Sequence, residues 1–131
     1  MGREGNLMFT YIKKHGTSAY YEFQYCKENL PSELLVTPEY YGKHHFLSDS
    51  LLIYIDDDER FFPLYINYLT PTHSPDGSGR FFPYGVNYYD REQTENMIKR
   101  ISEDKPLQYK ILIDWLEKAA QEYNGFYFLG L

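Results

Sequence analysis

The chain contains little cysteine, and this limits the kinds of site that it can form. It has one cysteine, Cys26, among 131 residues, so it can form neither an internal disulfide nor a cysteine-rich zinc site by itself. No run approaches the roughly 18 apolar residues of a membrane span, and residues 1–6 lack the apolar stretch of a signal peptide. These features predict a reduced, cytoplasmic protein in which Cys26 is a small buried residue.

Positive charge is also scarce. The 13 Lys and Arg residues are outnumbered by 19 Asp and Glu residues, and the net charge is −6. Nucleic acids and anionic membranes are bound through an excess of Lys and Arg. We therefore expect no direct nucleic-acid partner and no membrane partner.

Catalytic and metal-binding motifs are missing from the sequence. There is no HExxH, EF-hand, P-loop or nucleophile-elbow spacing, so we predict no catalytic residue and no cofactor. A metal site could still be built from His44 and His45 with one or more of Asp56, Asp57 and Asp58. Adjacent histidines on a strand point to opposite faces, however, and a solvated turn accounts for the acidic run more simply.

Aromatic residues, in contrast, are abundant: 15 Tyr, 9 Phe and 1 Trp. So many tyrosines cannot all be buried with their hydroxyls hydrogen-bonded, so several should lie half-covered at the surface. Surfaces rich in tyrosine suit recognition because each ring offers a large contact area with few rotatable bonds. Alternatively, these rings cover the outer faces of strands, where aromatic side chains are favoured.

Apolar runs with period two predict a sheet. The first two runs should pair as a hairpin, with Glu22 and Gln24 on the face opposite the buried one. The acidic run at residues 56–59 is expected to be a turn. The strand candidates cover residues 7–12, 19–26, 51–55, 62–68, 82–88 and 126–131.

Two of these candidates echo each other. Residues 60–70 and 80–90 share Arg, Phe, Phe, Pro, Asn and Tyr in register, twenty positions apart. The echo predicts two strands with the same facing pattern, joined by an exposed loop at residues 71–79. The matched positions are Phe62, Leu64, Ile66 and Tyr68 with Phe82, Tyr84, Val86 and Tyr88.

A helical period replaces the strand period after Tyr89. Asp90 and Gln93 form a capping-box pattern, Pro106 suits the first turn of a second helix, and Asn124-Gly125 ends that helix. We therefore predict one domain over residues 1–131 in the α+β class. It should hold a mostly antiparallel sheet of about five to six strands, with the two helices of the C-terminal half packed on one face.

The negative charge is concentrated in one segment. Residues 28–59 hold eight acidic side chains against a single base, Lys43. Acids interleaved with aromatics suit the binding of a basic surface, because charge steers the encounter and rings supply buried anchors; the alternative is a solvated segment. The candidate partner-binding residues are Tyr40, Tyr41, Asp56, Asp57, Asp58 and Glu59.

The C-terminal third of the chain resembles a known group of proteins. About 50 residues, from Phe82–Tyr89 through Arg91-Glu92-Gln93 and Trp115–Ala119 to Gly125–Gly130, resemble small bacterial immunity proteins that accompany secreted polymorphic toxins, including contact-dependent inhibition systems. The resemblance implies a cytoplasmic, non-enzymatic protein that neutralises a cognate toxin domain, often by occluding a basic nuclease active site. It implies no particular contact residue.

Three functional hypotheses follow. The first is an immunity-type inhibitor that binds a basic toxin domain, such as a nuclease, through the candidate residues above. The second is a small-molecule or carbohydrate-binding module in which Tyr and Phe rings line a cleft beside residues 71–79. The third is a small metal-dependent enzyme that uses His44, His45 and the acidic run.

Overall fold

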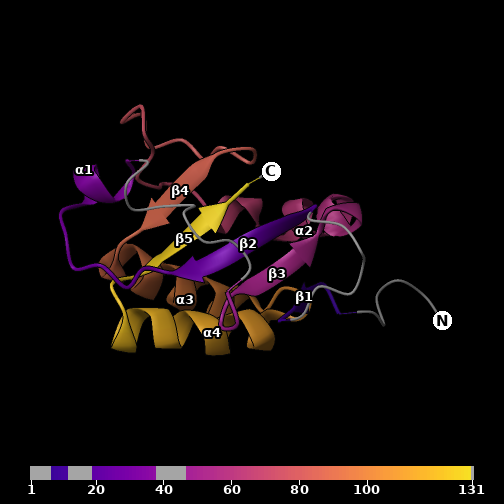
Figure 1. The fold of residues 1–131 in the computed structure, drawn as a ribbon. Coiled ribbons are helices and arrows are strands. Elements are labelled where there is room, and N and C mark those ends of the chain that lie inside the picture. The colour runs from indigo at the N-terminus through magenta and orange to yellow at the C-terminus, as the bar shows by residue number, and fades with distance from the viewer. Residues whose placement is uncertain (1–6, 12–18, 38–46, 131) are drawn as a thin grey trace.

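A five-stranded antiparallel sheet forms the centre of the computed structural model, which describes residues 7–11, 19–37 and 47–130. The order across the sheet is β1-β3-β2-β5-β4 (Figure 1). This arrangement confirms the predicted α+β class, with helices packed against the sheet in the C-terminal half. The strands are β1 (Phe9–Thr10), β2 (Tyr20–Tyr25), β3 (Leu51–Tyr54), β4 (Val86–Tyr89) and β5 (Phe126–Leu129).

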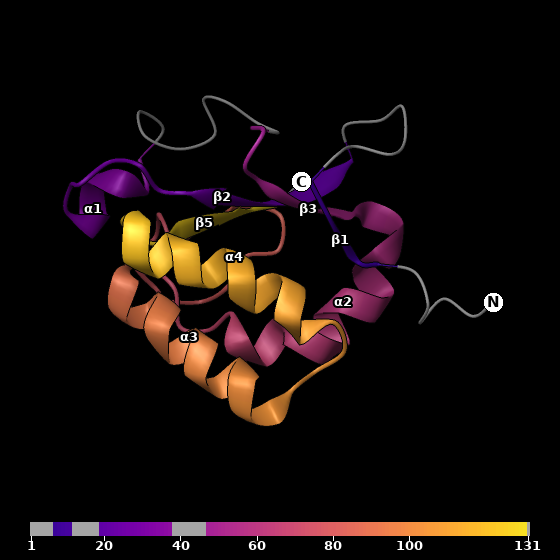
Figure 2. The same cartoon turned by 90° about the horizontal axis from the view of Figure 1, so that it is seen from below.

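The two long helices lie side by side beneath the sheet (Figures 1 and 2). None of the described helices combines the length and the apolarity that a membrane span requires. The helical elements are α1 (Ser32–Leu35), the 3-10 turns η2 (Ile55–Asp57) and η3 (Ile66–Tyr68), α2 (Asp58–Tyr65), α3 (Arg91–Asp104) and α4 (Tyr109–Glu122).

The core between sheet and helices is built from aromatic rings. Phe23 of β2 packs edge-on against Trp115 of α4 and Phe128 of β5, with ring centroids 5.8 and 5.1 Å apart. Tyr25 stacks on Trp115 at 4.1 Å. Such ring pairs add to the free energy that burial of their apolar area already contributes.

Strand β2 is buried on both faces, which corrects the prediction of one polar face. Glu22 and Gln24 are as inaccessible as their apolar neighbours. Ser50 Oγ and Gln24 Nε2 donate hydrogen bonds to Glu22 Oε2, at 2.6 and 3.1 Å, and these bonds offset the cost of burying the carboxylate. A second cluster covers part of this face, with Cys26, Leu35, Val36, Tyr88, Tyr127 and Leu129 as its buried members.

The predicted hairpin between residues 7–12 and 19–26 is wrong. Strand β2 pairs with β3 on one edge, Phe23 opposite Leu51, and with β5 on the other, Phe23 opposite Phe128. Because both edges of β2 are occupied, β1 joins the sheet at the outer edge of β3, with Phe9 opposite Ile53.

The predicted strand at residues 62–68 is also wrong, and so is the predicted turn at residues 56–59. Residues 55–68 form η2, α2 and η3. The buried side chains of α2 are Phe61 and Tyr65, whose spacing of four places them on one helical face, and Leu69 just after η3 is buried too. The acidic residues form η2 and the first turn of α2, where negative charge complements the helix dipole.

The second copy of the echo forms different structure from the first. Only Val86–Tyr89 is a strand, and the preceding residues form an irregular turn. The loop at residues 71–79 is less exposed than predicted, because Thr72 and Ser74 are buried. His73 and Tyr88 exchange two backbone hydrogen bonds, which fasten this loop to β4.

The two predicted helices of the C-terminal half are confirmed. Asp90 and Gln93 form the capping box at the start of α3, and α4 buries Trp115 and Leu116 against the sheet. Gly125, with φ of +78°, ends the helical segment. Helix α4 begins at Tyr109, three residues after Pro106.

Candidate partner-binding surface

The acidic run, residues 56–59, and the turn that precedes β4, residues 82–85, lie at the same end of the sheet. Strand β3 ends there opposite the start of β2, with Tyr54 opposite Tyr20. Strand β5 ends there opposite the start of β4, with Leu129 opposite Val86. The residues that follow β3 and those that precede β4 therefore emerge at the same end of the molecule (Figure 1).

The four acidic candidates at this end differ in their surroundings. Asp56 and Glu59 are exposed, whereas Asp57 and Asp58 are half-buried. Arg60 lies 3.6 Å from Asp57, and the Tyr21 hydroxyl donates to Asp58 Oδ2 at 3.4 Å. This end of the sheet therefore presents a negatively charged surface that is partly anchored to the core.

The turn that precedes β4 is held by several hydrogen bonds. Gly85 N donates to Phe82 O at 3.2 Å, and Gly130 N donates to Gly85 O at 2.8 Å. Asn87, fully buried, bonds the Phe82 backbone at both N and O, 2.8 Å each. The turn also packs directly on Gly130, where a Cβ atom would lie 2.1 Å from Pro83 O. Its conformation is thus fixed by the ends of β4 and β5.

This fixed turn presents the side chain of Tyr84 to solvent. Tyr84 is 70% exposed, more than any other large apolar or aromatic side chain of the described residues. Burial chiefly, and then the neighbouring Asp58 and Tyr84, raise the pKa of Tyr21 to about 12. The Tyr21 hydroxyl therefore lies within electrostatic reach of both.

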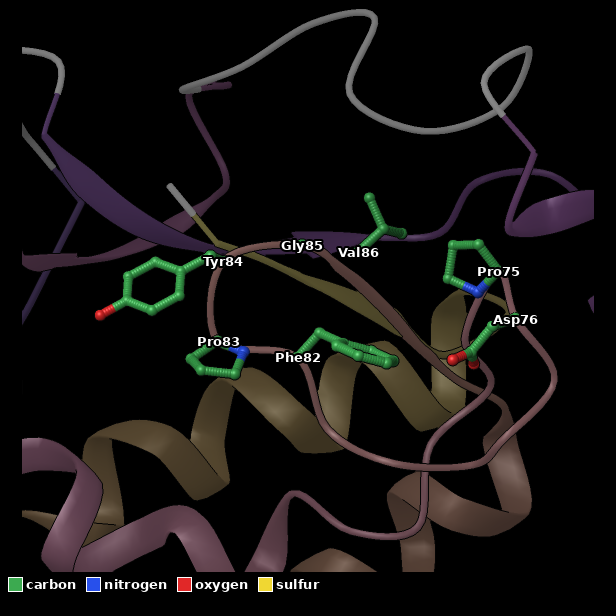
Figure 3. A pocket seen from close by; sticks show the side chains of 7 residues that line it. All are labelled: Pro75, Asp76, Phe82, Pro83, Tyr84, Gly85 and Val86. Carbon is green, nitrogen blue, oxygen red and sulfur yellow. The ribbon is translucent and has the colours of Figure 1, made fainter.

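A cavity of about 320 Å³ opens beside Tyr84, between the turn and the loop at residues 71–79 (Figure 3). Rings and aliphatic groups form most of its walls. This is the position at which the small-molecule hypothesis requires a cleft. The lining residues are Pro75, Asp76, Phe82, Pro83, Tyr84, Gly85 and Val86.

Asp76 is the one charged residue among these seven. Ser78 N and Ser74 Oγ both donate to its Oδ1, each at 2.9 Å. These hydrogen bonds, that from the Ser78 backbone first, lower the pKa of the Asp76 carboxyl below its usual value. The cavity therefore has an ionised carboxylate at its edge at neutral pH.

The sequence predictions for this surface have different outcomes. The structure brings Asp56, Asp57, Asp58 and Glu59 together at one end of the sheet. Tyr40 and Tyr41 lie outside the described residues, as do His44 and His45. Across residues 7–11, 19–37 and 47–130, no three His, Cys, Asp or Glu side chains are arranged to hold a metal ion.

The sequence patterns give no binding role to two residues of this surface. The echo predicts a strand at Tyr84, and residues 71–79, which include Asp76, are predicted as an exposed loop. The tripeptide Pro83-Tyr84-Gly85 is a turn signal in its own right and could have placed Tyr84 at the surface.

A second, polar cavity of about 340 Å³ lies elsewhere on the molecule. Its cations are engaged, since Lys27 pairs with Asp49 at 2.8 Å and Arg91 Nε donates to Tyr123 O at 2.6 Å. Burial raises the pKa of the Cys26 thiol, which disfavours the thiolate that a nucleophile would need. Its lining residues are Cys26, Lys27, Asn29, Arg91, Glu122, Tyr123 and Asn124.

The chain was also compared with known proteins. No protein-family model matches it, and the comparisons with curated proteins and with solved structures likewise find no match.

Proposed function

We propose that this protein is a non-enzymatic inhibitor that binds a basic partner through the end of the sheet described above. Asp56, Asp57, Asp58, Glu59 and Tyr84 form this acidic-tyrosine surface. The partner is a cognate toxin domain of the kind that immunity proteins neutralise, a nuclease being one candidate, and the site of action is the cytoplasm.

The observation that carries the proposal is the exposed Tyr84 ring at the same end of the sheet as the four acidic side chains. Negative charge accelerates the encounter with a basic protein. A tyrosine ring that becomes buried on binding is a common energetic anchor of an interface. Tyr84 stands on a turn fixed by Asn87 and Gly130, so little conformational entropy is lost on binding.

The C-terminal resemblance supports the toxin-domain assignment. The residues that carry it include the Phe82–Tyr89 segment, which contains Tyr84. Immunity proteins often act by occluding a basic active site, and an acidic end of a sheet suits that kind of contact.

The test begins with the neighbouring genes: a gene there for a large secreted protein with a variable C-terminal domain would supply that domain as the binding probe. Its dissociation constant for the wild-type chain is measured by calorimetry. It is then measured for Asp56→Asn/Asp58→Asn/Glu59→Gln and, separately, for Tyr84→Ala. We expect each variant to bind at least about tenfold more weakly, which corresponds to about 1.4 kcal/mol.

A matched control removes three exposed acids from α3 and α4, as Glu92→Gln/Glu95→Gln/Glu117→Gln. Both triple variants lose the same net charge, and each removes acids from the first turn of a helix. The control should bind within about threefold of wild type. Equal weakening by both triple variants would show a general charge effect and would reject this surface, as would unchanged binding by Tyr84→Ala.

The cavity favours a second candidate function, a small-molecule or carbohydrate-binding module. About 320 Å³ of mostly apolar space lies within the range of ligand sites. A thermal-shift screen with neutral sugars and small aromatic compounds separates the two functions. Stabilisation by such a compound that is lost in Val86→Trp would favour the second candidate.

A further inference from the structure

We propose that the cavity beside Tyr84 receives one lysine or arginine side chain of the partner. The aliphatic stem would lie along Phe82 and Val86, and the cationic head would reach Asp76. This inference rests on the proposed function in one respect, that the partner is basic. It adds a pocket that selects one partner side chain to the surface formed by the acidic run and Tyr84.

The lining of the cavity matches the two halves of such a side chain. Figure 3 shows Phe82 in the middle of the lining, Tyr84 on one side of it, and Pro75 with Asp76 on the other. Lysine and arginine place an apolar stem along apolar surface and keep the charged head in a polar environment. The cavity offers apolar walls with a carboxylate at one side only.

The carboxylate is set to accept a cation. Hydrogen bonds from Ser78 N and Ser74 Oγ hold Asp76 Oδ1, so the group is oriented before a ligand arrives. The net charge of −6 and the acidic run at the same end of the sheet attract cations and repel anions. Anionic ligands are therefore disfavoured in this cavity.

A neighbouring residue shows that the Phe82 ring already accepts a cation. The guanidinium carbon of Arg80 lies 5.7 Å from the centre of the Phe82 ring, within the range of cation–π contacts. Arg80 also attracts the Asp76 carboxylate. A partner side chain would compete with Arg80 for both groups, so Arg80 weakens the binding of an incoming cation.

The test uses two small probes and the whole chain. N-acetyl-arginine amide and its neutral isostere, N-acetyl-citrulline amide, are titrated while backbone amide shifts are followed by NMR. A probe of this size should bind with a dissociation constant on the order of 1 mM. Its shifts should centre on Asp76, Phe82, Gly85 and Val86, and the citrulline probe should produce much smaller ones.

Two variants move the affinity in opposite directions. Asp76→Asn keeps an oxygen that can accept from Ser74 and Ser78, yet removes the charge, so the arginine probe should bind at least about fivefold more weakly. Arg80→Gln removes the competing cation and should strengthen its binding. Lys99→Gln on α3 changes the net charge as Arg80→Gln does and should leave the affinity unchanged.

Several results would overturn the pocket. These are equal shifts from the citrulline probe, arginine shifts confined to residues 56–59, and unchanged affinity in Asp76→Asn. The two proposals fail separately: the variant Asp56→Asn/Asp58→Asn/Glu59→Gln should lose toxin binding while still binding the arginine probe. If toxin binding depends on the acidic run and the arginine probe does not bind, the proposed function stands and the pocket does not.

Discussion

Asn87 holds the peptide groups of Phe82 from both directions: its Oδ1 accepts from Phe82 N and its Nδ2 donates to Phe82 O, each at 2.8 Å. A third bond runs from Nδ2 to Phe128 O at 3.3 Å. A single buried amide thus joins the turn that presents Tyr84 to the last strand of the sheet. The exposed ring is positioned by a residue that a partner would never contact.

Replacing this amide should destabilise the fold. In Asn87→Ala, Phe82 N loses its Asn87 partner, whereas Phe82 O keeps the bond from Gly85 N, and an unsatisfied buried group costs about 1–3 kcal/mol. We therefore expect the free energy of unfolding, measured with urea, to fall by about 1–3 kcal/mol. Asn67→Ala, at the matching position of the echo, lies on the exposed side of η3 and should change it by less than about 0.5 kcal/mol.

Two glycines with nearly equal φ angles should respond differently to alanine. Gly77 and Gly125 have φ of +72° and +78°, so alanine is strained at both, by about 1–2 kcal/mol. A Cβ at Gly77 meets no atom within 4 Å, whereas one at Gly125 would lie 1.9 Å from Tyr89 O. The melting temperature should therefore fall modestly for Gly77→Ala and much further for Gly125→Ala. Similar losses would mean that the backbone near Tyr89 shifts easily.

Alkaline pH should unfold the protein cooperatively. An unfolded tyrosine titrates near pH 10, and in the folded chain burial raises the pKa of Tyr21 to about 12 and those of Tyr65 and Tyr89 further still. Above pH 10 the unfolded chain releases protons that the folded chain retains. The stabilisation is therefore complete below pH 10 and is lost as the pH rises through and above 12. Tyrosinate absorbance and circular dichroism should change together, and gradual ionisation with native circular dichroism would contradict this prediction.

Asp90 supplies both a hydrogen bond and a negative charge at the start of α3, and two variants distinguish their contributions to stability. Asp90 Oδ1 accepts from Gln93 N at 2.8 Å, and Oδ2 lies 3.0 Å from His73 Nε2. Asp90→Ala removes both contacts and should lower the free energy of unfolding, measured with urea, by about 1–2 kcal/mol. Asp90→Asn can keep the capping hydrogen bond, so it should lower this free energy by less than about half as much. Equal losses would show that the charge of Asp90 matters more than its cap.

Local signals were sufficient for the part of the fold that follows Tyr89. The capping pair Asp90 and Gln93, the apolar stripe of α3 and the glycine after α4 all act within a few residues. Strand β5 was equally clear, because a short apolar run followed a helix stop. Here local preference and tertiary packing favour the same structure.

The errors arose where a segment satisfied two periods at once. Residues 61–69 place apolar side chains at spacing two, through Phe62 and Leu64, and at spacing four, through Phe61 and Tyr65. The similarity to residues 80–90 favoured the strand, yet burial of Phe61 and Tyr65 on one face favours the helix. The partners of β1 and β2 could not be predicted, since they depend on residues distant in sequence.

Only part of the candidate surface could be predicted, because the rest depends on residues that are distant in sequence. Asp56–Glu59 are contiguous, so any structure keeps them together. The place of Tyr84 at the same end of the sheet depends on where β3 ends and β4 begins, and the strand order was not available from the sequence. The place of Asp76 depends in turn on the bridge between His73 and Tyr88.

The position of β5 has a consequence for how the chain reaches this structure. Strand β5 lies between β2 and β4, and it pairs Phe128 with Phe23, more than a hundred residues earlier. Closing so long a loop is slow, and β2 and β4 are joined only once β5 has entered the sheet. The aromatic edges of both strands remain open until then, so we expect folding intermediates that lack a docked β5 to be prone to aggregation.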